Sequence, residues 1–212
     1  MKKRMIIGGV IIAGLIAAAA WGPVVSNVPE ARYTVTFKQD DFEIRDYAPM
    51  IVATVIVTGD RKTAIGDGFR LLADYIFGNN VAATKIEMTA PVIQQQQGQD
   101  IAMTKPVLQT ETPDGKAWDV AFVMPAHYTL ETLPKPVNDA VRIETRPARQ
   151  FAVISFNGRA TPDDLAAKTT ALSGFVQAKN LKTIGEPSFA FYNPPMTLPF
   201  LRRNEVMVEI TN

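Results

Sequence analysis

The chain has 212 residues, 47% of them apolar and 20% charged, which suits the packed core of one ordinary domain or two small ones. It contains no cysteine, so disulfides, thiolate chemistry and lipid attachment through cysteine are excluded. The first 25 residues hold three of the 22 basic residues and none of the 21 acidic ones, which leaves 19 against 21, a net charge of −2, for the rest. Without a cationic excess we expect no nucleic-acid partner, because such binding depends largely on phosphate neutralisation.

The N-terminus has the layout of an export signal. Lys2, Lys3 and Arg4 precede an uncharged run over residues 5–25. Two alternatives remain. The segment is either a cleaved signal peptide, in agreement with the small residues at 17–20, or a retained anchor, which needs roughly 20 apolar residues. Cations before the span place that end in the cytoplasm, so both predict an exported, periplasmic body. The preferred interpretation is an inner-membrane anchor at residues 5–25.

After a linker at residues 26–31, the chain shows the patterns of strands, then a helix, then strands. The predicted elements of this first unit are strands at 33–39, 42–47 and 50–59, a helix within 63–80, a strand at 85–97, and another strand after a turn at Asp114–Gly115. In the helix, Ile65, Phe69, Leu72 and Ile76 form one apolar stripe, and Gly78 is placed to end it.

The second unit repeats this order. Its predicted elements are strands at 140–147 and 149–158, a helix from Thr161 with Pro162 in its first turn and a capping box to Asp164, and strands at 188–195 and 204–210. The stripe of this helix, Leu165, Leu172 and Val176, lies 100 residues after the first one, and the strand from 188 corresponds to the one from 85.

The repeat predicts an α+β fold in which duplicated β-β-α-β-β units form a distorted antiparallel β-barrel with two packed α-helices. The predicted organisation is a signal peptide or anchor at 1–25, a linker at 26–31 and one domain at 32–212, with pseudo-repeats at about 32–125 and 138–212.

The residues needed for common catalytic sites are missing. His127 is the single histidine, which excludes the usual zinc and Cys–His sites. The four serines include none in a G-x-S-x-G elbow, and the carboxylates show no acid–base spacing. These features predict a binding protein that is not an enzyme.

Five segments together resemble the SOUL haem-binding family. They are RDYAPMIVATVIVTG, GFRLLADYIFGNN, KIEMTAPV, FVMPAHYTLETLPKP and YNPPMTLPFLRRNEV, in the family's order, and the likeness covers about residues 32–211. The resemblance implies a duplicated barrel with two helices and non-enzymatic binding of haem or related tetrapyrroles by a carrier or buffer. It also implies an apolar cleft between the first helix and the loop before the last strand.

Carried onto this chain, the cleft would use the outward side of the first helix and the loop at 194–201. Arg70 would pair with a propionate, and glycine in the helix would let a flat ligand, or the underlying sheet, approach the backbone. The implied ligand-binding residues are Gly66, Phe69, Arg70, Leu71, Phe77, Met196, Leu198 and Phe200. The alternatives without a ligand are that Phe69 belongs to the core and that the loop packs on its own barrel end.

Two further assignments stay open. Arg202 and Arg203 either reach propionates, or Arg202 ties the loop to a carboxylate such as Glu205 or one on the first helix, and the structural role is preferred. His127 is the candidate axial ligand of iron, but its segment does not match the position proposed in some family members, and a solvated loop histidine is the alternative. Without a ligand, the cleft would bind metal-free porphyrin as well. Rival functions are a module for other amphipathic anions, such as lipids, a protein or membrane interaction domain, and an enzyme that uses His127 with a carboxylate.

Overall fold

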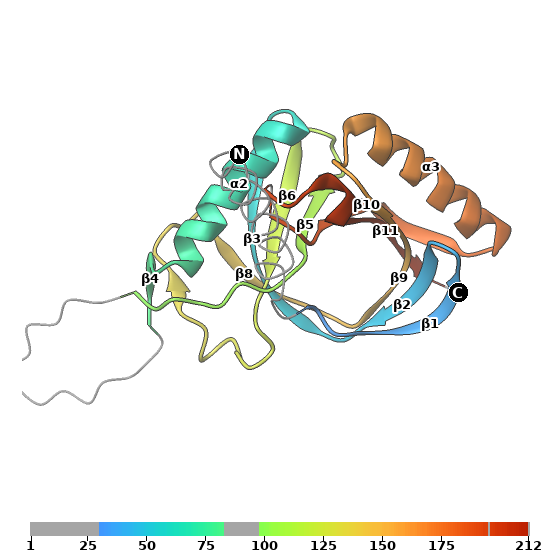
Figure 1. Ribbon diagram of the computed structural model, residues 1–212. Helices are drawn as coiled ribbons and strands as arrows, with labels where there is room; N and C mark the ends of the chain where they lie inside the picture. The colour runs from blue at the N-terminus through green and yellow to red at the C-terminus, as the bar shows by residue number, and fades with distance from the viewer. Residues whose placement is uncertain (1–29, 83–97, 195, 212) are drawn as a thin grey trace, which may run out of the picture.

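The computed structural model describes residues 30–82, 98–194 and 196–211. Within them, nine antiparallel strands form one strongly curled sheet with two α-helices on its outside, and two short strands form a separate ladder (Figure 1). The strands are β1 (Tyr33–Gln39), β2 (Phe42–Tyr47), β3 (Met50–Thr58), β4 (Asn80–Val81), β5 (Val107–Glu111), β6 (Ala117–Val123), β7 (Lys135–Pro136), β8 (Arg142–Arg146), β9 (Arg149–Asn157), β10 (Lys182–Phe191) and β11 (Arg203–Thr211). The helices are α2 (Arg61–Ile76), α3 (Pro162–Ala178) and the short 3-10 helix η1 (Pro199–Leu201).

The order of the strands confirms the duplication. The sheet runs β1-β2-β9-β11-β10-β5-β6-β3-β8, and one β-β-α-β-β unit is β2-β3-α2-β5-β6 while the other is β8-β9-α3-β10-β11. If the strands of each unit are numbered 1 to 4 in chain order, the sheet from β2 to β8 has the order 1-2-4-3-3-4-2-1. This order is the same from either end. The two units are therefore related by an approximate two-fold axis between β5 and β10, where Thr110 pairs with Ser188.

Both helices begin at side-chain caps that the local sequence provides. Asp60 accepts hydrogen bonds from the backbone N–H groups of Lys62 and Thr63 at the start of α2. At the start of α3, Thr161 and Asp164 form the predicted capping box, each side chain accepting from the other's backbone N–H. Such caps satisfy amide groups that the first turn of a helix leaves without partners.

The helices pack on the outer face of the sheet. One core lies between α2 and strands β3 and β6, and another lies between α3 and strands β9, β10 and β11. A third cluster lies on the concave face and includes Val52, Val153 and Met207. Because successive side chains of a strand point to opposite faces, Val52 faces the concave side while Ala53 packs against α2.

The buried face of α2 differs from the predicted apolar stripe because it includes small residues. The buried positions are Ala64, Gly68, Leu72, Tyr75 and Ile76, whereas Ile65 is only half-buried and Phe69 is exposed. The predicted stripe is confirmed at Leu72 and Ile76 and only in part at Ile65 and Phe69, because the helix comes closest to β6 at Gly68, which has no side chain. In α3 the predicted stripe is confirmed, since Leu165, Leu172 and Val176 are all buried.

The strands also differ from the predictions in places. β10 begins at Lys182 rather than at 188, and β5 is the strand that pairs with both β10 and β6. The predicted strand at 85–97 lies outside the described residues, and β5 holds the position that the two-fold axis relates to β10. In the described part of the chain, neither helix is long and apolar enough to cross a membrane, and the predicted anchor at 5–25 lies outside that part. The repeat boundaries and the linker remain predictions.

Candidate functional site

The loop between β10 and η1, with η1 itself, exposes four large apolar side chains. Met196 and Phe200 are each 69% exposed, and Leu198 and Leu201 are also exposed. We refer to these four residues as the apolar loop. Met196 and Phe200 therefore do not pack on the barrel end, whereas Leu198 and Leu201, 40% and 39% exposed, are partly covered.

Hydrogen bonds from neighbouring elements fix the backbone of this loop. The Arg202 Nε donates to the carbonyl of Thr197 at 2.7 Å, and the Arg203 N–H donates to Asn193 Oδ1 at 2.7 Å. The Gly158 N–H donates to the carbonyl of Pro199 at 3.0 Å, and Asn157 Nδ2 donates to that of Arg202 at 2.9 Å. The backbone from Thr197 to Arg202 is thus tied to the end of β9 and the residue after it.

The predicted structural role of the two arginines is confirmed, with their parts exchanged. It is Arg203, not Arg202, that bonds Glu205, through Nε at 2.9 Å and Nη2 at 2.8 Å. Arg203 also pairs with Glu30 at 3.1 Å, and its guanidinium carbon lies 4.0 Å from the centre of the Tyr192 ring. Arg202 binds the loop backbone instead.

Glu205 is the centre of a buried polar cluster that sequence reasoning missed. Its carboxylate is fully buried and accepts two hydrogen bonds from Arg45, at 2.8 and 2.9 Å, and one from the Tyr192 hydroxyl at 2.7 Å. Burial alone would raise the pKa of Glu205, but the hydrogen bonds and charge of Arg45, with the charge of Arg203, hold it below the ordinary 4.5. The cluster joins β2 to β11, which are 160 residues apart between Arg45 and Glu205.

The two glycines of α2 serve different purposes. A Cβ on Gly68 would lie 2.8 Å from the Cβ of Val120, so this glycine lets the helix approach the sheet. A Cβ on Gly66 would meet nothing within 4 Å, and Gly66 is exposed. A glycine in this helix was expected to allow close approach of either the sheet or a flat ligand. Gly68 allows close approach of the sheet, and of the two only Gly66 is accessible to a ligand.

The other predicted residues of α2 lie in different environments. Phe69 is 38% exposed and also packs edge-on against Phe122, with ring centres 5.2 Å apart, so it is both a surface and a core residue. Arg70 is exposed and pairs with Asp67 one turn earlier, while Leu71 is half-buried against the core. Phe77 is exposed at the C-terminal end of the helix.

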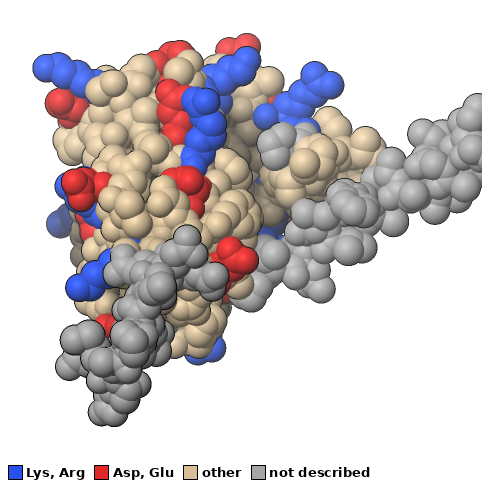
Figure 2. Space-filling view, turned by 90° about the vertical axis from the view of Figure 1, so that its left-hand side faces the viewer, with Lys and Arg blue, Asp and Glu red and all other residues tan. Residues whose placement is uncertain are grey.

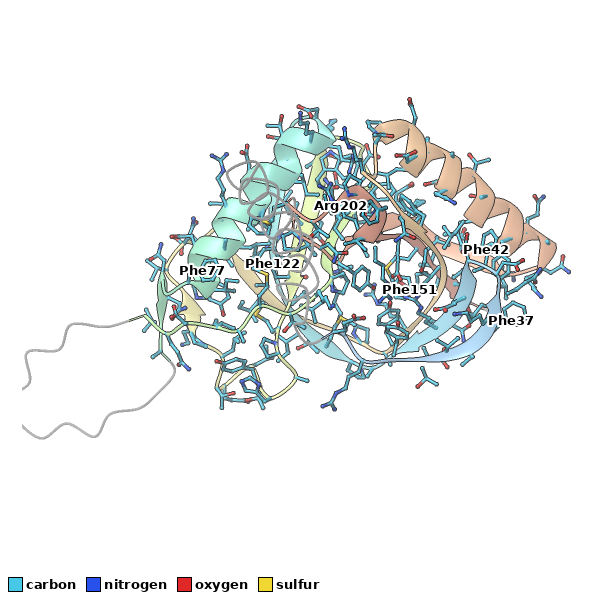
Figure 3. All side chains as sticks on the ribbon, viewed as in Figure 1. Phe37, Phe42, Phe77, Phe122, Phe151 and Arg202 are labelled. Atoms are coloured by element: carbon cyan, nitrogen blue, oxygen red, sulfur yellow. The ribbon has the colours of Figure 1, made fainter. Side chains whose placement is uncertain are left out.

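The structure brings the N-terminal end of α2, but not its C-terminal end, toward the apolar loop. The segment between β9 and α3 contacts both, because Ala160 accepts from Arg61 Nη2 at 3.4 Å while Gly158 donates to Pro199. Phe77 lies at the far end of α2, well away from Arg202 (Figure 3). The assignment of these residues to a single cleft remains a prediction, and Phe77, at the end of α2 away from the apolar loop, fits it least.

His127 lies on an exposed turn after β6, its ring 4.3 Å from that of Tyr128. Among the described residues, no group of three or more histidine, aspartate or glutamate side chains could hold a metal ion. Its role as an iron ligand remains a prediction.

A cavity of about 650 Å³ opens on the concave face of the sheet. Phe151 points into this curl (Figure 3). No sequence signal pointed to the cavity, because its wall comes from eight strands spread over almost the whole domain. On the face that Figure 2 shows, acidic and basic side chains of the described residues alternate, without an extended region of either sign.

Comparison with known proteins identifies the family. The family model described as "SOUL heme-binding protein" matches residues 28–209. A relative is "Heme-binding protein 2" of Homo sapiens, 30% identical over 169 residues that make up 78% of this chain and 76% of the relative.

Solved structures show the same fold at low sequence identity. The EcmrR C-terminal domain matches with a TM-score of 0.58 and 9% identity, over 85% of this chain and 98% of that one. A hydrolase from Listeria innocua matches with a TM-score of 0.52 and 11% identity, over 83% and 94%. The family match spans nearly all of the barrel and both helices, and this chain therefore belongs to the SOUL haem-binding family.

Proposed function

We propose that this chain binds haem and related tetrapyrroles as a carrier or buffer, without catalysing a reaction. We place the ligand on the apolar loop and on the neighbouring N-terminal half of α2, where Gly66 and Phe69 are exposed. The observation that supports this site most is that four large apolar side chains are exposed on a loop with a fixed backbone. A preorganised apolar surface binds a rigid, flat ligand with little loss of conformational entropy.

The charge next to this site suits a ligand with carboxylates. Arg70 is highly exposed, and its ion pair with Asp67 lies on the surface. Exposed pairs of this kind contribute roughly 0–1 kcal/mol, so a propionate can replace Asp67 at little cost. Arg202 and Arg203 hold the loop in place and are not assigned to the ligand.

We infer that the site does not depend on an axial ligand to iron. The apolar loop contains no side chain that readily ligates haem iron except the thioether of Met196. Binding through apolar contact and carboxylate pairing would then accept metal-free porphyrin as well as haem. Ligation by His127 is the competing assignment.

Titration of the full-length chain with haem and with metal-free protoporphyrin, followed by absorbance in the Soret region, tests the proposal. Phe200→Ala and Met196→Ala should each weaken binding of both ligands, roughly tenfold for Phe200, because a large apolar side chain contributes about 1.5–3 kcal/mol on burial. Leu130→Ala is the matched control, since Leu130 is exposed on a different loop. His127→Ala should leave both affinities unchanged.

Each other outcome has a clear meaning. Loss of the haem spectrum in His127→Ala alone would assign the ligand to that histidine and overturn the unligated site. Absence of affinity for either porphyrin would refute tetrapyrrole binding and favour another amphipathic anion or an interaction surface. Equal loss in Leu130→Ala would show that the measured affinity is not specific to the loop.

We also propose that residues 5–25 hold the domain at the outer surface of the inner membrane, in the periplasm. The cationic start and the apolar length of the segment support this. Protease added to spheroplasts should degrade the domain if it lies outside, and protection from protease in intact spheroplasts would refute the proposal.

A further inference from the structure

The cavity on the concave face of the sheet has an apolar floor. Tyr47, Met50, Leu108, Phe151 and Met207 line it, and all five are buried or half-buried. Its volume of about 650 Å³ lies within the range of sites for small organic molecules, which is roughly 300–1,000 Å³. The rings of Tyr47 and Phe151 meet edge to face, with centres 5.5 Å apart, and the half-buried Phe151 offers more aromatic surface to a ligand than Tyr47, which is 5% exposed.

The charged residues of the lining are mainly acidic. The lining contains two basic residues, Arg146 and Arg149, and five acidic ones, which gives it a net charge of −3. Both arginines are already bonded within it, Arg146 to Asp119 at 2.8 Å and Arg149 to Glu209 at 3.0 Å.

The three remaining carboxylates lie exposed at the rim, and they are Glu111, Glu144 and Glu186. Glu144 has only a long contact of 4.0 Å to Arg142, which is not part of the lining. A hollow lined by an excess of one charge raises the local concentration of ligands of the opposite charge.

A bulge in β10 forms one side of the mouth. The pairing of β10 with β11 shifts register between Ile184 and Ser188, and Gly185 has a φ of 68°. Ile184, Gly185 and Glu186 all line the cavity at this bulge, so one apolar and one acidic side chain lie at its mouth. Bulges commonly redirect side chains beside functional sites.

We propose that this cavity is a second binding site, specific for amphipathic organic cations with an aromatic body. The aromatic body lies on Tyr47 and Phe151, where a cation gains from the ring faces, and the two methionines adapt to its shape. The positive charge faces the rim carboxylates. The same carboxylates repel the propionates of a tetrapyrrole, so this site is chemically distinct from the apolar loop.

A pair of dyes with one ring system tests the charge preference. Rhodamine 6G is a xanthene cation and fluorescein is a xanthene dianion, and fluorescence anisotropy measures the binding of each to the full-length chain. We expect rhodamine 6G to bind more tightly than fluorescein and to weaken as salt is added. Glu111→Gln combined with Glu186→Gln should lower its affinity roughly three- to tenfold, as expected for two exposed charges.

Two control variants separate this site from other surfaces. Glu131→Gln removes an exposed glutamate outside the cavity and should leave the affinity for rhodamine 6G unchanged. Phe200→Ala should weaken porphyrin binding but not dye binding, and haem should not displace the dye. Any dye that binds the N-terminal segment contributes equally in all of these proteins.

The proposal is overturned if fluorescein binds as tightly as rhodamine 6G, or if the double variant keeps the full affinity. Displacement of the dye by stoichiometric haem would also overturn it, because it would show that both ligands share one site. Failure of porphyrin to bind would leave this result unaffected.

Discussion

Alanine at the two glycines of α2 should have opposite effects on stability. At Gly66 the new methyl group meets open solvent, so the variant gains about 1 kcal/mol of helix propensity. At Gly68 the same gain is offset, because the new Cβ would lie 2.8 Å from both Cβ and Cγ2 of Val120 and 3.1 Å from Cγ1. Carbon atoms prefer a separation of about 3.5–4.0 Å, so the helix or the strand must shift by roughly 1 Å.

Val120 has little freedom to move away. It is fully buried in β6, an interior strand of the sheet, and its β-branched side chain is stiff about χ1. Overpacking of this kind costs about 1–3 kcal/mol, which leaves Gly68→Ala about 1–3 kcal/mol less stable than Gly66→Ala. For a domain of this size, each 1 kcal/mol corresponds to about 2–4 °C in Tm.

Urea unfolding of both variants, with the m-values compared, measures this difference. The reasoning is refuted if Gly68→Ala is as stable as Gly66→Ala, since the close approach of helix and sheet would then be unimportant. The same pair informs the ligand site. If a porphyrin lies against Gly66, Gly66→Ala should lower its affinity while raising stability, a combination that general damage to the fold cannot produce.

Two further predictions concern the polar cluster and the second helix. Glu205→Gln should destabilise the domain by about 3–5 kcal/mol in urea unfolding, because Arg45 and Arg203 lose the buried carboxylate that both bond and, among the described residues, Arg45 keeps only Glu43 as a carboxylate partner; a loss under 1 kcal/mol would contradict this. Since the folded pKa of Glu205 is lowered, its stabilisation is present above the unfolded value near 4.5 and is lost as pH falls through the folded pKa. The wild type should therefore lose Tm on acidification more steeply than Glu205→Gln, and parallel curves would be the contrary result. Thr161→Ala should cost about 1 kcal/mol by removing the N-cap of α3, and an unchanged midpoint in urea would show that the cap is not needed.

The sequence predicts features that depend on neighbouring residues better than those that depend on distant ones. The capping box of Thr161 and Asp164 spans three residues, and it was predicted correctly. Gly68 was not recognised as a buried position, because a helix touches a sheet most closely where its own side chains are smallest. Arg45 lies in a strand that alternates as if half-exposed, and only its partner 160 residues later explains its burial.

In the candidate site, too, features that depend on neighbouring residues were predicted better than those that depend on distant ones. The prolines and apolar residues of the loop pointed to an exposed apolar surface, and Met196 and Phe200 are indeed exposed. The separation of Phe77 from that loop depends on the direction in which α2 crosses the sheet. The cavity depends on how strongly the sheet curls, which no local pattern encodes.

The two-fold arrangement of the sheet has a consequence for how the domain folds. β8, the first strand of the second unit, pairs with β3 of the first unit, and β2, the first strand of the first unit, pairs with β9 of the second. The first strand of each unit therefore belongs to the sheet of the other. Neither unit can complete its own sheet, and a chain cut between β7 and β8 would leave both fragments with a missing strand. Unfolding should therefore be a single cooperative event for the whole domain. Folding should be slow, because these pairings join residues roughly 100 positions apart and the loop-closure entropy is lost before the contacts form.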